Sequence, residues 1–265
     1  MELNRPLTAE EVSHYRAHGY TILQETVPHA VLTALIQETG TLEQWEELPG
    51  KWMKYFERSE DVGAHRRLCR IENFYPYSEI WRKFMTSRHL LEVVAELMGE
   101  PAALFKEKIN YKLPGGGGFA AHQDAPAFGV FNTTGHITLM VPLDPATPEN
   151  GGIEMATGAP SGILEDTHPD GTLTDALVQS LTWTPLTLFP GDLLLFDSFI
   201  PHRSGPNESI RSRNAAFITY GRAKDGEFRD LYFEKKREAF PPECEWDGKT
   251  PREGPNPFNL GNPIR

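Results

Sequence analysis

A change of pattern near Gly99 constrains the fold more than any other feature of this 265-residue chain. Before Gly99 the sequence predicts helices. After it, short runs rich in β-branched and aromatic residues alternate with clusters of Pro, Gly and Asn. Helices followed by many short strands favour a mainly β fold, a sandwich or barrel faced by N-terminal helices. The strand-like runs are residues 103–112, 136–143, 184–189, 193–197 and 214–220.

The N-terminal part also contains local signals for where helices begin and end. Thr8 and Glu11 form a capping box, in which each side chain satisfies a free backbone N–H at the start of a helix. Gly19 suits the end of that helix because glycine readily adopts a left-handed backbone. The remaining predicted elements are a strand at 20–23, a helix that begins at Pro28 and a helix at 87–98.

We expect one domain that spans residues 1–265, because no internal repeat or low-complexity linker divides the chain. It would consist of a helical part at 1–100, a β core at about 101–235 and a loop-rich tail. The tail from residue 241 is rich in Pro, Gly and Asn and is expected to wrap on the surface. Hydrophobic residues make up 39% of the chain, enough for a sizeable core.

Charge and cysteine content narrow the classes of partner. A net charge of −11 argues against nucleic acid or an anionic membrane as a general partner, because both would be repelled. Cys69 and Cys244 form neither a disulfide framework nor a zinc-finger spacing. The first residues lack a signal-peptide pattern, and no apolar run approaches the roughly 20 residues of a membrane span. We therefore expect a cytoplasmic protein with a small-molecule substrate; the sequence does not determine its oligomeric state.

The clearest candidates for chemistry are His122, Asp124 and His202. In extended backbone, residues i and i+2 point to the same face, so His122 and Asp124 can project into one cavity while Gln123 points away. His202 follows an apolar strand that begins after Pro-Gly-Asp at 190–192. Two imidazoles and one carboxylate form the facial triad that leaves open positions on non-haem Fe(II).

Each of these elements also has a plain structural interpretation. A single His-X-Asp is common by chance, and His202 alone suits a surface loop because Arg, Ser and Gly follow it. The other histidines fit structural or solvent-exposed positions. Only His136 lies near a predicted core strand, where it could line the pocket.

Arg213 is the reason to consider the three residues together. It lies eleven residues after His202 and begins the last strand-like run. A guanidinium is a planar fork that binds a carboxylate in bidentate fashion, so Arg213 could anchor the distal carboxylate of 2-oxoglutarate, whose other end chelates iron. The alternative is a solvated turn with Arg203 and Arg211, which explains Arg211 but not the spacing between His202 and Arg213.

Together these motifs resemble the phytanoyl-CoA dioxygenase family of Fe(II)/2-oxoglutarate oxygenases, over about residues 8–235. The matching motifs are Lys-Glu-Lys-Ile-Asn-Tyr-Lys at 106–112, the glycines at 115–118, His-Gln-Asp at 122–124, Met-Val-Pro-Leu-Asp at 140–144, Pro-Gly-Asp at 190–192, and His-Arg-Ser-Gly at 202–205 with Arg213. The resemblance implies a double-stranded β-helix, a jelly roll related to the cupins.

The resemblance also implies roles for individual residues. His122, Asp124 and His202 would bind Fe(II) and carry catalysis. The carboxylate of 2-oxoglutarate would be held by Arg213 and Ser204. Further cosubstrate contacts are implied for Asn110, Phe119 and Thr138.

The reaction implied by the resemblance is a hydroxylation that consumes O₂ and converts 2-oxoglutarate to succinate and CO₂. Halogenating members of the wider group replace the carboxylate ligand with a small residue, which frees a coordination position for chloride. Because Asp124 is present, hydroxylation of an unactivated C–H is the expected outcome.

Five residues are predicted to face the substrate: Lys106, Lys108, Gln123, Phe128 and His136. The two lysines share one face of a predicted strand, so one could pair with an anionic substrate group; alternatively, both cap an exposed strand end. The motif at 106–112, with Val-Pro-Leu-Asp-Pro-Ala-Thr at 141–147, looks closest to members acting on small polar metabolites, including 2-aminoethylphosphonate hydroxylases. A bulky acyl-CoA would favour a basic rim, of which the acidic composition gives no sign.

Three alternatives stay open from the sequence. The chain could be a catalytically inactive jelly-roll binding protein, a hydroxylase of an acyl-CoA or natural-product intermediate, or a zinc hydrolase with the same three ligands. A zinc hydrolase would leave the spacing of Arg213 from His202 unexplained. The sequence does not determine the substrate or the carbon that is oxidised.

Overall fold

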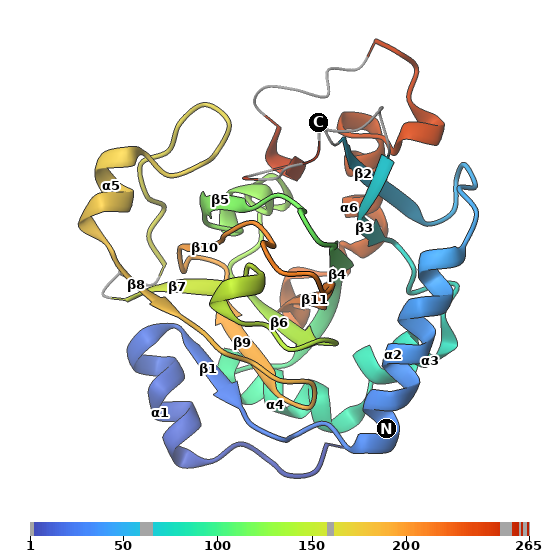
Figure 1. Cartoon of the computed structure of the whole chain (residues 1–265). Coiled ribbons are helices and arrows are strands. Elements are labelled where there is room, and N and C mark those ends of the chain that lie inside the picture. The colour runs from blue at the N-terminus through green and yellow to red at the C-terminus, as the bar shows by residue number, and fades with distance from the viewer. Residues whose placement is uncertain are drawn as a thin grey trace.

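The computed structural model describes residues 3–58, 66–157, 162–249, 256–259, 261 and 264. Two antiparallel β-sheets form the centre of the molecule (Figure 1). The larger sheet contains, in spatial order, β1 (Tyr20–Leu23), β9 (Leu193–Asp197), β6 (His136–Pro142), β11 (Arg213–Arg222), β4 (Ala102–Lys112), β3 (Arg66–Glu72) and β2 (Met53–Arg58). The smaller contains β5 (Phe119–His122), β10 (His202–Ser204), β7 (Ile153–Thr157) and β8 (Thr182–Pro185).

The strands of the larger sheet alternate between two hydrophobic layers, as the period of two in a strand requires. On β11, Ala216, Ile218 and Tyr220 belong to a core shared with the N-terminal helices, whereas Ala215 and Phe217 belong to a core shared with the smaller sheet. β6 and β9 divide their residues in the same way. The inner face of the larger sheet therefore looks toward the smaller sheet, and its outer face is covered by helices.

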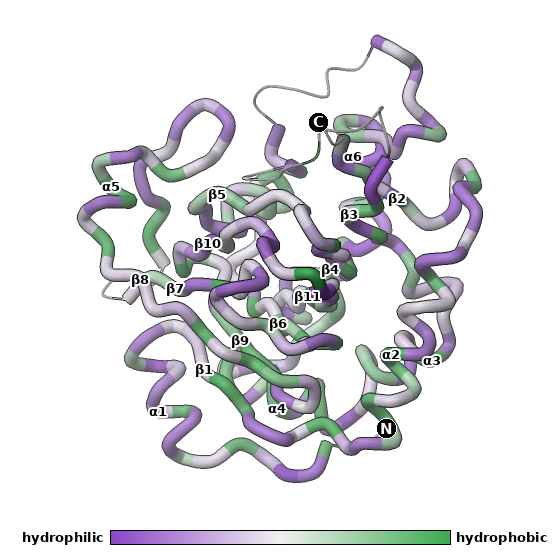
Figure 2. The backbone as a smooth tube through the Cα atoms, in the orientation of Figure 1, coloured by the Kyte–Doolittle hydropathy of each residue, from purple (hydrophilic) through white to green (hydrophobic). Residues whose placement is uncertain are grey.

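Four N-terminal helices cover that outer face: α1 (Ala9–His18), α2 (His29–Gln44), α3 (Glu79–Met85) and α4 (Arg88–Met98). Figure 2 shows hydrophobic stretches of β1, β9 and α4 gathered on one side of the molecule. The predicted capping box of Thr8 is present, and Gly19 and Gly99 end their helices with a left-handed backbone. No helix in the described ranges is both long and apolar enough to cross a membrane.

The N-terminal part also supplies strands that the sequence did not predict. β2 and β3 pair with each other, and β3 pairs with β4 through Arg70, Ile71 and Glu72. The charged side chains of Arg70 and Glu72 interrupt the apolar pattern of β3. They are buried there because they form an ion pair at 3.1 Å. The one strand expected before Gly99, at 20–23, is present as β1, and β2 and β3 are additional to it.

Two further expectations need correction. The strand predicted at 184–189 ends at Pro185 in β8, although Leu188 still forms an isolated bridge to Ala146. The tail does not lie only on the surface. Phe258, in the short 3₁₀ helix η6 (Pro257–Asn259), and Ile264 are buried in a cluster with helix α6 (Arg229–Ala239). Other parts of the tail lie outside the described residues.

Candidate metal and cosubstrate site

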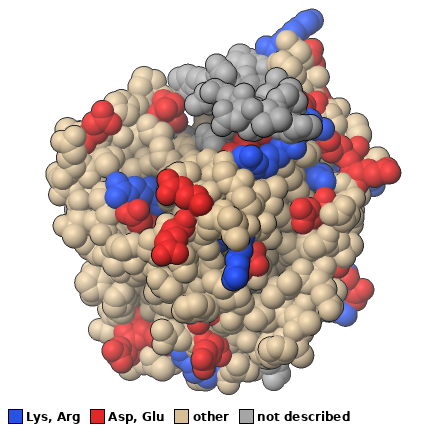
Figure 3. All heavy atoms as spheres, in the orientation of Figure 1, with Lys and Arg blue, Asp and Glu red and all other residues tan. Residues whose placement is uncertain are grey.

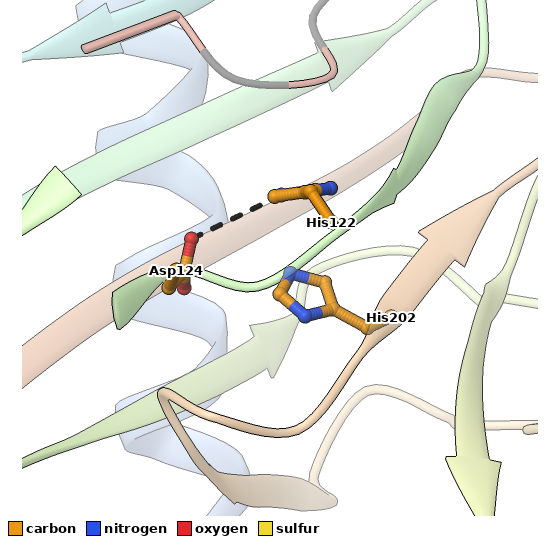
Figure 4. A group of neighbouring side chains, drawn as sticks. All are labelled: His122, Asp124 and His202. Atoms are coloured by element: carbon orange, nitrogen blue, oxygen red, sulfur yellow. Dashed lines mark ion pairs between the residues drawn. The ribbon is translucent and has the colours of Figure 1, made fainter. Parts of the chain in front are cut away.

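Three side chains that could bind a metal lie together where β5 ends and β10 begins (Figure 4). His122 is the last residue of β5, His202 is the first of β10, and the two are directly paired in the antiparallel ladder. Asp124 follows the end of β5, and its Oδ1 lies 3.9 Å from Nε2 of His122. One ligand atom from each residue lies within 4.8 Å of the others, and all three side chains are buried.

The backbone reaches this arrangement differently from the sequence prediction. Asp124 is not extended: its φ of −76° and ψ of −28° are helical, and it precedes the 3₁₀ helix η1 (Ala125–Ala127). A tight turn after β5, rather than the two-residue period of a strand, brings Asp124 beside His122. Gln123 does point away, as predicted, since its amide bonds the carbonyls of Ile163 and Phe199.

Both imidazoles are oriented by the backbone with one nitrogen left for a metal. Nδ1 of His122 lies 2.7 Å from the carbonyl of Ala120, and Nδ1 of His202 lies 3.0 Å from that of Ile200. A carbonyl only accepts, so each Nδ1 donates and each Nε2 keeps its lone pair. Burial lowers the pKa of His122 to about 3 and also lowers that of His202, so both rings are neutral at pH 7.

Asp124 completes a donor set that fits Fe(II). Burial alone would raise its pKa, but the nearby cations, Lys106 first among them, lower it below the ordinary value. The carboxylate is therefore ionised, and its Oδ2 accepts a hydrogen bond from Thr138 at 3.4 Å. One carboxylate and two neutral imidazoles on one side of a cavity leave open positions, which suits non-haem iron.

Next to the triad lies a cavity that is also lined by a buried cationic side chain, Arg213. Arg213, the first residue of β11, is 2% exposed, and its Nε has no hydrogen-bond partner among the described residues. Its Nη2 donates to the carbonyl of Gly151. Lys112 donates to Oγ of Ser204 at 2.8 Å. A buried guanidinium with an unused donor beside a cavity is suited to hold a carboxylate.

This first cavity contains most of the predicted cosubstrate residues. Its walls include the triad members His122, Asp124 and His202, together with Arg213, Ser204, Asn110, Phe119 and Lys108. Thr138 is the exception, because it lies behind Asp124 and also bonds Thr219 at 3.0 Å. The structure thus brings Arg213 and the triad together across strands that are far apart in sequence.

A second cavity adjoins the triad and shares Lys108, Phe119, His122 and Asp124 with the first. It is lined by His122, Asp124 and Phe119 and by Lys106, Lys108, Arg70, Glu72, Tyr232, Lys236 and Phe258. Glu72 is held by Lys236, with both oxygens at 2.6 Å, and by Arg70. Burial alone would raise the pKa of Glu72, but these two cations lower it to about 2.

Of the five predicted substrate residues, Lys106 and Lys108 line the two cavities described above, and the other three line neither of them. Phe128 lies beside Lys106 of the second cavity, whose ammonium is 4.6 Å from the ring centre of Phe128. His136 is buried against Phe105 and Phe128, away from both cavities. Gln123 is fully buried and bonded to backbone groups behind the site. Substrate contact by His136 and Gln123 stays a prediction without a geometric basis.

Sequence reasoning missed the side chains that β3, α6 and the tail contribute to the second cavity. These are Arg70, Glu72, Tyr232, Lys236 and Phe258. A signal existed for β3, where the charged residues Arg70 and Glu72 alternate with the apolar Ile71. Charged residues in such an alternation indicate a polar wall within a sheet. No comparable local signal distinguishes Lys236 from its exposed neighbours on α6.

Comparison with known proteins agrees with this geometry. A family model described as phytanoyl-CoA dioxygenase matches residues 15–215. The 2-aminoethylphosphonate dioxygenase of uncultured bacterium HF130_AEPn_1 is 48% identical over 259 residues, which cover 97% of this chain and 98% of that protein. The methylphosphonate hydroxylase of Gimesia maris is 35% identical over 238 residues, 90% of each chain.

A solved structure with the same fold is EctD from S. alaskensis with 2-oxoglutarate and 5-hydroxyectoine. It aligns with a TM-score of 0.68 at 19% identity, covering 84% of this chain and 78% of that one. At this identity the likeness concerns the fold alone. It confirms the jelly roll predicted from the sequence.

Proposed function

The chain belongs to the phytanoyl-CoA dioxygenase family and is an Fe(II)- and 2-oxoglutarate-dependent dioxygenase, and from this premise we propose that it hydroxylates a small organophosphonate, with 2-aminoethylphosphonate as the first candidate. The observation that carries this proposal is the 48% identity, along nearly the whole of both chains, to a protein named for that substrate. A second relative, named for methylphosphonate, shares the phosphonate group.

In this proposal His122, Asp124 and His202 hold the iron through two Nε2 atoms and one carboxylate. The bound metal supplies activation of O₂, coupled to conversion of 2-oxoglutarate to succinate and CO₂. Arg213 and Ser204 orient the distal carboxylate of the cosubstrate, and Asn110 and Phe119 form the wall beside it. Thr138 acts indirectly, through its hydrogen bond to Asp124.

The remaining residues restrict access and exclude water. Phe119 lines both cavities, and Phe258 closes the second one from the tail. A small substrate fits such a site, because buried side chains surround the triad on both sides. Figure 3 shows only small groups of Lys and Arg among acidic residues on the face it displays, so no broad basic rim for an acyl-CoA lies there.

The decisive test is a substrate panel scored for succinate release and for a hydroxylated product by ³¹P NMR. The panel contains 2-aminoethylphosphonate, methylphosphonate, the carboxylate analogue 3-aminopropanoate and an acyl-CoA. We expect product from a phosphonate and none from the carboxylate. Turnover of the acyl-CoA alone, or of no compound, would contradict the proposal.

Two further measurements test the assigned residues. Anaerobic addition of Fe(II) and 2-oxoglutarate is expected to give the weak visible charge-transfer band of the chelate. Asp124→Ala is expected to abolish succinate release that depends on substrate, and an unchanged release would remove Asp124 from the site. Failure to take up any divalent metal would favour an inactive binding protein, whereas turnover without O₂ would favour a zinc hydrolase.

A further inference from the structure

Two lysines beside the triad lack the counter-ions that buried charges ordinarily have. Lys106 is 6% exposed and Lys108 is half-buried, and both project from the inner face of β4. Within the described part of the chain, neither ammonium has a hydrogen bond or a carboxylate oxygen at ion-pair distance. Both ammonium groups lie over aromatic rings: that of Lys106 is 4.6 Å from the ring centre of Phe128, and that of Lys108 is 5.3 Å from that of Phe217.

The other charges of the second cavity are already matched. Glu72 is bonded to Lys236 and to Arg70, and Arg70 also donates to Asn110 at 3.1 Å. Asp124 belongs to the metal site. The cavity thus contains four cationic side chains and two carboxylates, Glu72 and Asp124, that are both engaged. The charges left beside the triad without a partner are those of Lys106 and Lys108.

Leaving one buried and one half-buried ammonium group unpaired is costly, so a purely structural role does not explain them. Burial lowers the pKa of both, and the carboxylates of Asp124 and Glu72 offset this only in part. A bound anion would compensate both charges. Lysine suits a phosphonate, because its compact charge can donate to any of the three oxygens of a tetrahedral group.

We propose that Lys106 and Lys108 together form the subsite for the substrate's doubly charged phosphonate group and make that double charge the main determinant of specificity. This inference rests on the proposed function. The two lysines differ in position: of the two cavities, Lys106 lines the second, whereas Lys108 lines both. Lys106 is therefore the cleaner probe of substrate binding.

The test measures binding without turnover, by calorimetry on protein loaded with Fe(II) and 2-oxoglutarate in the absence of oxygen. The ligands are 2-aminoethylphosphonate and the singly charged 2-aminoethylsulfonate. The variants are Lys106→Met and Lys108→Met, with Lys235→Met, an exposed lysine on α6, as the matched control.

We expect Lys106→Met and Lys108→Met to weaken phosphonate binding by about 30-fold or more and sulfonate binding by much less. Lys106→Met should leave the affinity for 2-oxoglutarate within about twofold and should raise the thermal midpoint, because it removes an unpaired buried charge. Lys235→Met should change none of these quantities. A structural lysine would behave oppositely, with a lowered midpoint and equal losses for both ligands.

The outcomes separate this inference from the proposed function. Phosphonate turnover that does not depend on either lysine would overturn the subsite while leaving the function intact. Binding that depends on the lysines without any turnover would support the subsite and overturn the function. Absence of phosphonate binding to the wild-type protein would overturn the subsite in either case.

Discussion

At the scale of single residues, the site depends on buried charges whose partners determine what they can bind. Glu72 is satisfied by Lys236 and Arg70, so it contributes to stability. Arg213 keeps one unused donor and is available to a ligand. The same residue types thus serve different purposes according to whether the protein itself completes their hydrogen bonds.

Arg213→Met is expected to raise the KM for 2-oxoglutarate by roughly 30- to 100-fold, about 2–3 kcal/mol, because it removes charged hydrogen bonds to the distal carboxylate. The matched control is Arg211→Met, which changes an exposed arginine two residues earlier. Steady-state kinetics with varied 2-oxoglutarate measures the effect. Equal KM values for the two variants would remove Arg213 from the cosubstrate site.

Glu72→Gln is expected to destabilise the protein at pH 7 by about 3 kcal/mol, because it removes the carboxylate that binds the buried ammonium of Lys236. The folded-state pKa of Glu72, about 2, lies below the ordinary value of 4.5. Its contribution is therefore complete above about pH 4.5 and is lost as the pH falls toward 2.

Urea unfolding at several pH values between 7 and 3 checks this expectation. The stability difference between wild type and Glu72→Gln should shrink at the acid end. Glu234→Gln, an exposed change on the same helix as Lys236, is the control and should have little effect. A difference that stays constant over this range would refute the assigned cause.

At the scale of elements, one strand organises both cavities. β4 directs Lys106, Lys108, Asn110 and Lys112 to its inner face, while Ile109 and Tyr111 on the other face pack under the helices. The period of a strand thus sets a row of polar groups beside the triad. The tail contributes to the same region, since the N–H of Ala120 donates to the carbonyl of Gly261 at 2.9 Å.

Gly261→Ala is expected to weaken metal binding by about 10- to 100-fold, because the orientation of a ligand histidine depends on what surrounds it. An added Cβ would lie 2.8 Å from the carbonyl oxygen of Ala120 and 3.0 Å from Nδ1 of His122. It would disturb the hydrogen bond that orients this ring.

Gly248→Ala is the matched control for this change. Gly248 has the same left-handed backbone, but a Cβ there meets nothing within 4 Å. Anaerobic Fe(II) titration compares the two variants. Equal affinities would show that the tail does not support His122.

At the scale of the whole molecule, the N-terminal part and the β core share one sheet. β1 pairs with β9 across about 170 residues, and β3 pairs with β4 at the other end of the same sheet. The outer core also mixes residues of both parts. We propose that the chain forms a single domain.

A single domain should unfold in one cooperative transition, with coincident curves from tryptophan fluorescence and far-UV circular dichroism. A fragment of residues 101–265 should stay unfolded, because it lacks β1, β2, β3 and the helices that cover the outer face. Two separate transitions, or a folded fragment, would contradict the proposal.

The sequence by itself determined the features that depend on local order. Turn and cap residues such as Thr8 and Gly19 specify where elements begin and end, and the alternation of residues along a strand specifies its faces. The identity and order of the ligand motifs indicated the metal site and its family. These inferences need only neighbours in the chain.

Only the tertiary structure decided which charged side chains are paired and which face a ligand. Lys236, Glu72 and Lys106 come from α6, β3 and β4, and no local pattern shows that the first two neutralise each other while the third stays free. The physical reason is that the cost of a buried charge depends on every group around it. Those groups are brought together by the packing of the sheets, helix and tail, not by the sequence near each residue.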